Sequence, residues 1–144
     1  MPFSIEIHRR PGFVHFEFRG TASLPDFVEG VGVVETETLF WGDRCALFDL
    51  CGVDGELPPE DQVFLGELVG RNLSHLYRLA SVVPPDRLTR RSETAARDMG
   101  VRLRVFTDAD EAAGWLSQGF QESAPALLHE SEGLRRLLDG RELS

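Results

Sequence analysis

Hydrophobic and polar positions alternate in two short runs near the N-terminus. Apolar residues occupy every second position over residues 3–8, and the same period of two returns over residues 13–19. Pro11 and Gly12 lie between the two runs and form a turn signal. Two alternating runs joined by a tight turn are typical of an antiparallel hairpin with one face on the hydrophobic core. We therefore predict that the sheet begins with such a hairpin.

The pattern then changes to the period of a helix. Ser23 is a favourable N-cap residue, and Asp26 lies at the position of a capping-box acid. Most apolar residues between 24 and 40 fall on one helical stripe. Gly30 and Gly32 lower the helix propensity of this segment. The pattern therefore leaves two alternatives, a continuous helix or a helix that breaks near Gly32.

A dense apolar run marks the predicted central strand at residues 44–51. Five of the seven residues 44–50 are apolar, which indicates burial on both faces. Asp49 near the end of this strand could face a ligand crevice, although a turn or cap role is the favoured interpretation. Cys45 and Cys51 would be about 20 Å apart in an extended strand, too far for a disulfide. We interpret both as small buried hydrophobic residues.

The rest of the chain alternates between helices and strands. Prolines and acids favour helix starts, with Asp86 and Asp108 as predicted caps, and glycines favour helix ends. On these signals we predict helices over residues 58–76, 86–99 and 108–119, and strands over residues 78–83 and 101–106. Right-handed crossovers make the later strands parallel. The predicted fold class is α/β, a mixed β-sheet in which an N-terminal antiparallel hairpin is followed by alternating strands and helices.

The chain length of 144 residues is that of one domain. We assign residues 1–119 to this domain and residues 120–144 to a C-terminal tail with a short helix. No apolar run approaches the roughly 18 residues of a membrane span. The N-terminal residues also lack the order of a signal peptide. We therefore expect no integral membrane segment and a cytoplasmic location.

Acidic residues concentrate in the first half of the chain. The formal net charge is −9, and residues 1–72 hold 13 acids against 5 arginines. This balance argues against general binding to nucleic acid or to anionic membranes. All 15 basic residues are arginine, which excludes lysine Schiff-base chemistry and a P-loop lysine.

Residues 47–53 carry the pattern apolar-apolar-Asp-Leu-x-Gly-Val. Together with the order of elements, this strand resembles the STAS domain, the fold of bacterial anti-sigma factor antagonists. Residues 105–116 look like the last strand and helix of its SpoIIAA-like branch, which shares a topology with lipid-binding CRAL-TRIO domains. The resemblance covers about residues 3–118 and implies a SpoIIAA/STAS-like fold. It also implies a non-enzymatic regulatory or protein-interaction role.

The chain departs from this family where the family carries its switch. Classical antagonists place a phosphorylatable serine or threonine just after the Gly-Val pair, whereas residues 54–60 contain no hydroxyl. We therefore expect the classical serine switch to be absent. The acids here suit the start of a helix, and permanent mimicry of the phosphorylated state is the less favoured alternative. The resemblance places partner contact in this region, at Gly52, Asp54, Gly55, Glu56 and Glu60.

Arginines gather in the predicted helix over residues 86–99. Arg87, Arg90 and Arg91 have the spacing of one helical face and could bind an anion or an acidic partner. A solvated face that pairs with nearby acids is the favoured interpretation, because exposed ion pairs are common.

Two of the four histidines, His8 and His15, could be neighbours on paired strands of the hairpin. Two histidines alone do not make a metal site, and we find no cysteine or carboxylate spacing that completes one. We therefore interpret them as surface histidines and expect no metal and no cofactor.

Two functions of different classes remain. The preferred function is a non-enzymatic module that binds a protein partner. A homodimer of this chain is considered as well. The alternative is a small-molecule or lipid carrier, with an apolar or anionic ligand between the sheet and the helices at residues 24–40 and 58–76. An enzyme is disfavoured because no nucleophile, base and oxyanion set can be assembled.

Overall fold

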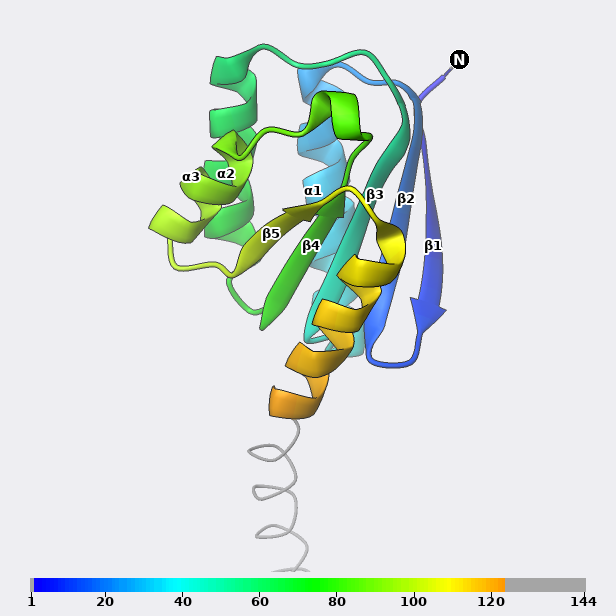
Figure 1. Cartoon of the computed structure of the whole chain (residues 1–144), viewed down its shortest axis with the longest axis vertical. Helices are drawn as coiled ribbons and strands as arrows, with labels where there is room; N and C mark the ends of the chain where they lie inside the picture. The colour runs from blue at the N-terminus through cyan, green and yellow to red at the C-terminus, as the bar shows by residue number, and fades with distance from the viewer. Residues whose placement is uncertain (1, 124–144) are drawn as a thin grey trace, which may run out of the picture.

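The computed structural model describes residues 2–123. They form a five-stranded sheet in the order β1-β2-β3-β4-β5, with helices on both faces (Figure 1). β1 and β2 are antiparallel, and each later neighbour pair is parallel. The predicted mixed α/β sheet is confirmed. The elements are β1 (Ser4–Arg10), β2 (Phe13–Thr21), α1 (Leu24–Trp41), β3 (Cys45–Asp54), α2 (Pro59–Asn72), β4 (Arg78–Val82), the 3-10 turn η1 (Pro85–Arg87), α3 (Arg91–Asp98) and β5 (Leu103–Phe106). A last helix begins at residue 109 and runs to residue 123.

The helices divide the hydrophobic core into two layers. α1, α2 and α3 cover one face of the sheet, where Val14, Phe16 and Phe18 of β2 are buried. The helix over residues 109–123 packs on the other face, over part of β3, β4 and β5. It also reaches the start of β2, where Phe13 and Phe120 pack against the same cluster. None of the helices in the described part of the chain has the length and apolar character of a membrane span.

α1 is continuous, so the break considered near Gly32 does not occur. The Ser23 backbone N–H and hydroxyl both donate to the Asp26 carboxylate, each at 2.9 Å, which confirms the predicted helix start. Gly30 lies against the Phe18 ring, where an added Cβ would come within 3.1 Å of it. This close approach lets α1 pack flat on β2, and that packing compensates for the low helix propensity of the glycines.

β3 is longer than predicted and is buried on both faces only over residues 45–48. The strand continues past the predicted end at residue 51 to Asp54, because β3 still pairs with β2 after a register shift that adds one residue to β3. Gly52 permits this pairing, since a Cβ there would lie 2.9 Å from the Arg19 side chain. Cys45 is buried as predicted, but Cys51 is exposed. The interpretation of Cys51 as a buried residue was therefore wrong.

Asp86 does not cap α3. It lies in η1, and α3 begins only at Arg91, after an extended segment in which the Thr89 hydroxyl donates to Gln62 at 2.6 Å. This contact with α2 holds residues 88–90 out of the helix. The predicted helix over residues 86–99 is therefore divided in two.

The last helix was predicted to end at Gly119, but it continues through residue 123. Gly119 is instead a packing position, because an added Cβ would lie 2.3 Å from the Arg78 side chain. Arg78 crosses the helix here and donates to the Trp115 carbonyl at 2.8 Å. The domain boundary after residue 119 stays a prediction, and the predicted helix near Leu134 lies outside the described residues.

Candidate functional site

All five positions predicted for partner contact are exposed. They lie at the end of β3, in the loop that follows it and in the first turn of α2, and we call residues 52–60 the β3–α2 loop. Those positions are Gly52, Asp54, Gly55, Glu56 and Glu60. The loop follows the carboxyl end of a central parallel strand, the edge where open α/β sheets bind ligands. Gly55 has a φ of 82°, a conformation that favours glycine. Glu60 and Asp61 occupy the first turn of α2, where negative charge stabilises the helix dipole.

The three predicted anion-binding arginines do not share a helical face. Arg87 lies in η1, Arg90 is the residue before α3 and Arg91 is its first residue. Arg87 donates to the backbone carbonyls of Val53 and of Gly55, the latter at 3.2 Å. The Arg87 guanidinium therefore holds the backbone of the β3–α2 loop in place through these two hydrogen bonds. The predicted stripe was wrong because residues 85–87 turn back toward this loop.

Arg90 is occupied by an ion pair within α3. Its Nη1 lies 2.8 Å from the carboxylate of Glu93, a residue that is itself buried. Arg97 reaches the same carboxylate at 3.5 Å. Arg91 is exposed and lies beside a shallow groove between α2 and α3. Arg90 therefore fits the favoured interpretation, in which exposed arginines pair with nearby acids, better than it fits an anion-binding site.

An apolar cavity of about 170 Å³ lies beneath the loop, between the sheet, α1 and α2. Phe27, Phe48 and Leu65 contribute to its walls, and Arg87 lies in its lining. Its position matches the place predicted for a carrier's ligand. An engineered cavity of about 150 Å³ in another protein holds benzene, whereas drug-sized ligands occupy about 300–1,000 Å³. The cavity therefore fits one apolar ring or a short chain.

Neither cysteine thiol is activated as a nucleophile. Burial raises the pKa of Cys45. Cys51 is exposed as a residue, but partial burial of its thiol, together with the nearby Asp49 carboxylate, raises the pKa of Cys51. A raised pKa lowers the fraction of reactive thiolate at neutral pH. Neither thiol therefore has the lowered pKa that is typical of a catalytic cysteine.

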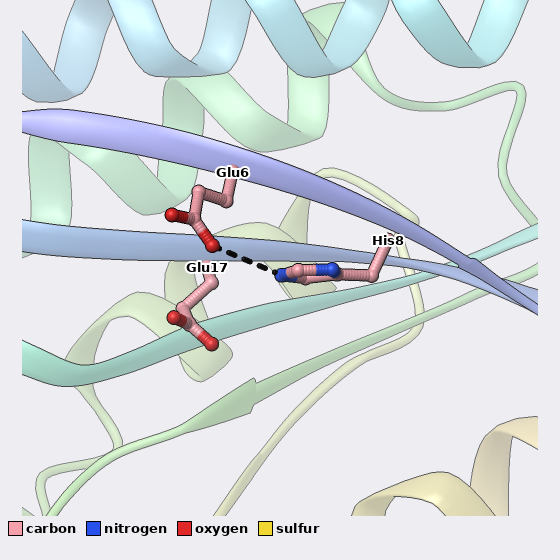
Figure 2. A group of neighbouring side chains, drawn as sticks. All are labelled: Glu6, His8 and Glu17. Atoms are coloured by element: carbon pink, nitrogen blue, oxygen red, sulfur yellow. Dashed lines mark ion pairs between the residues drawn. The ribbon is translucent and has the colours of Figure 1, made fainter.

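Five polar side chains gather on the face of β1, β2 and β3 that points away from α1. We call Glu6, His8, His15, Glu17 and Asp49 the open-face cluster. His8 and His15 are directly opposite each other in the β1–β2 register, with ring centroids 5.4 Å apart. Figure 2 shows Glu6, His8 and Glu17, with the Glu6–His8 ion pair dashed. The fold thus places carboxylates beside the two histidines, although no carboxylate spacing in the sequence indicated this.

Asp49 does not line the apolar cavity. It lies within β3, beside Glu17 in the β2–β3 register, rather than at a turn or cap. Its Oδ2 lies 3.2 Å from His15 Nε2, and its Oδ1 accepts a hydrogen bond from the Cys51 backbone N–H. The period of two could have placed Glu6 with His8, and His15 with Glu17, on one face. Only the strand pairing places Asp49 with them.

Comparisons with known proteins find similarity in structure alone. No protein-family model and no curated protein sequence matches the chain. A crystal structure of an anti-sigma factor antagonist from Mycobacterium paratuberculosis matches with a TM-score of 0.52 and 13% identity, over 80% of this chain and 94% of that one. An uncharacterised DUF3478-family protein with a SpoIIAA-like fold from Shewanella loihica matches with a TM-score of 0.46 and 22% identity, over 79% and 93% of the chains. The chain has the STAS/SpoIIAA-like fold.

Proposed function

We propose that this chain is a non-enzymatic regulatory module that binds a protein partner through the β3–α2 loop, without a phosphorylation switch. The observation that carries the proposal is the exposure of this loop in a STAS/SpoIIAA-like fold, at the place where that family carries its switch. Its side chains offer fixed charge in place of a hydroxyl. After Thr38, the next serine or threonine is Ser74.

The charge of the loop indicates the kind of partner surface it would fit. Asp54, Glu56, Glu60 and Asp61 are acidic, and Arg87 is turned inward to the loop carbonyls. A basic partner face would complement these acids and be steered toward them. Because carboxylates carry their charge constantly at neutral pH, the module would stay in one binding state. A phosphorylated serine, by contrast, can be added and removed.

Charge reversal at the loop tests this proposal. We expect the double substitution Asp54→Arg and Glu56→Arg to weaken binding of a co-purified kinase-like or sigma-factor-related partner by at least about tenfold, because like charges then face each other. The measurement is a pull-down from the source cells followed by titration of the purified partner. The control is Glu29→Arg with Glu111→Arg, which changes the net charge equally at exposed positions on α1 and the last helix.

Each result has a defined consequence. Loss of binding in the loop variant alone supports the proposed surface. Undiminished binding in that variant, or equal loss in the control, would place the contact elsewhere. Failure of the unmodified chain to retain any such partner would contradict the module itself.

The apolar cavity favours a second candidate function, a carrier of a small apolar compound. We expect Leu65→Phe to fill part of the cavity and to abolish the mass increase that a bound ring-sized compound gives in native mass spectrometry. Leu39→Phe is the matched control, because Leu39 is exposed on α1 and does not line the cavity. Indole is a suitable added probe. If indole binds neither the unmodified chain nor the control, the carrier function is excluded for compounds of this size.

A further inference from the structure

We propose that the open-face cluster binds a divalent metal ion of the zinc class, with Glu17 as the central ligand. This site goes beyond the proposed partner binding and is formed by different residues. Two groups of three side chains meet the spacing of a metal site. One group is Glu6, His8 and Glu17, and the other is His15, Glu17 and Asp49. In each group the potential ligand atoms all lie within 4.8 Å of one another.

The strand register holds the ligands in place. Glu6 lies opposite Glu17, and His8 lies opposite His15, in the antiparallel β1–β2 pair. Glu17 in turn lies beside Asp49 in the parallel β2–β3 pair. Side chains on one face of neighbouring strands are close enough to share a ligand. Three hydrogen-bonded strands form a rigid base, which a preorganised metal site needs.

In each group, the distance between a histidine nitrogen and a carboxylate oxygen suits a metal coordination sphere. His8 Nε2 lies 3.4 Å from Glu6 Oε2, and His15 Nε2 lies 3.2 Å from Asp49 Oδ2. Zinc bonds to histidine nitrogen and carboxylate oxygen are about 2.0–2.2 Å long, so two ligands at a tetrahedral angle lie about 3.3–3.5 Å apart. Little movement would therefore be required to place an ion between these atoms. Mixed imidazole and carboxylate ligands suit zinc and its neighbours in the first transition row.

The charges of the cluster favour a bound cation. Three carboxylates, Glu6, Glu17 and Asp49, form a row across three adjacent strands. Like charges directly opposite each other in a sheet are destabilising. Arg19 pairs with Glu17 but supplies only one positive charge against three negative ones. A divalent ion would remove the remaining repulsion.

The inner group, His15, Glu17 and Asp49, is the better ligand set for a single ion. These side chains are 16–19% exposed, whereas those of His8 and Glu6 are 34% and 54% exposed. His15 is already held by Asp49, and less side-chain freedom would be lost on binding. Each of these three side chains is partly exposed, so an ion can reach them from solvent. Water or a partner's group would complete the coordination.

Zinc titration of the full chain, without an affinity tag and after chelator treatment, tests the site. We expect calorimetry to give one zinc ion per chain and a rise in melting temperature with zinc concentration. His15→Ala and Glu17→Gln should each weaken binding by at least about tenfold, while His8→Ala should have a smaller effect. The control is His75→Ala, because His75 contacts Thr38 of α1, away from the cluster.

One further variant is expected to strengthen zinc binding, an effect that misfolding could not produce. Arg19→Gln removes the cation that competes for Glu17 and should strengthen zinc binding severalfold. Circular dichroism of each zinc-free variant checks that it folds. The proposal is overturned if the unmodified chain binds no zinc at millimolar concentration. It is also overturned if His15→Ala and Glu17→Gln bind zinc as the unmodified chain does, or if His75→Ala loses binding equally.

Discussion

Replacing Phe16 with alanine is expected to lower the free energy of unfolding by about 3–5 kcal/mol. Phe16 lies in the middle of β2 and is fully buried under α1. Its ring meets the Phe48 ring edge-on, with centroids 6.4 Å apart. The substitution removes the ring from the core and leaves a cavity that the rigid sheet cannot close. A domain of this size is stable by only about 5–15 kcal/mol, so the substitution should remove a large part of the total stability.

The measurement is chemical denaturation followed by circular dichroism. Phe40→Ala is the matched control, because Phe40 is 78% exposed near the end of α1 and should change stability by less than about 0.5 kcal/mol. Equal losses in the two variants would show that Phe16 does not lie at the centre of the core.

Replacing Gly66 with alanine is expected to lower the free energy of unfolding by about 1–3 kcal/mol. Alanine normally stabilises a helix by about 1 kcal/mol relative to glycine. At Gly66, however, the new Cβ would lie 2.5 Å from the Ser92 carbonyl oxygen and 2.9 Å from the Ser92 Cα. Both are backbone atoms, so no side-chain rotation relieves the contact. α2 and α3 would have to separate.

Gly32→Ala is the control, and it is expected to raise stability instead of lowering it. Gly32 lies in α1, and an added Cβ there meets no atom within 4 Å. Its replacement should raise stability by about 0.5–1 kcal/mol, as helix propensity predicts. Thermal unfolding of both variants measures the difference. If both substitutions stabilise the protein, α2 and α3 do not pack as closely as the structure shows.

The Gly66 contact also concerns the candidate site. Gly66 lines the apolar cavity, and the segment before α3 carries Arg87 and Thr89, which contact the β3–α2 loop and α2. Separation of α2 from α3 would therefore loosen the support of the loop. We expect this variant to weaken partner binding as well as stability. Loss of stability without loss of binding would show that the loop keeps its conformation independently of α3.

The local elements could be predicted well because their signals lie within a few residues of each other. The hairpin follows from the alternation on both sides of Gly12, and the start of α1 follows from Ser23 and Asp26. Boundaries were less accurate where distant segments intervene. β3 runs on to Asp54 because β2 pairs with it there, and residues 88–90 stay extended because Thr89 bonds to Gln62 in α2.

For the same reason, some features of the candidate site could be predicted from the sequence and others could not. The five contact positions came from the family resemblance, and the absence of a hydroxyl at residues 54–60 can be read directly from the sequence. The direction of Arg87 could not be predicted, because it depends on the path of the chain before α3. The apolar cavity could be placed between the sheet and the helices, but its size depends on how side chains from several elements pack.

The sequence by itself determined the order and type of the elements, the acidic character of the β3–α2 loop and the lack of a residue to phosphorylate there. These properties depend on neighbouring residues or on composition. Only the tertiary structure decided that Asp49 lies beside Glu17 and His15, and that Arg87 supports the loop. The physical reason is that strand register and chain path arise from packing between segments more than 30 residues apart. The open-face cluster exists because three strands, each unremarkable alone, are paired in one register.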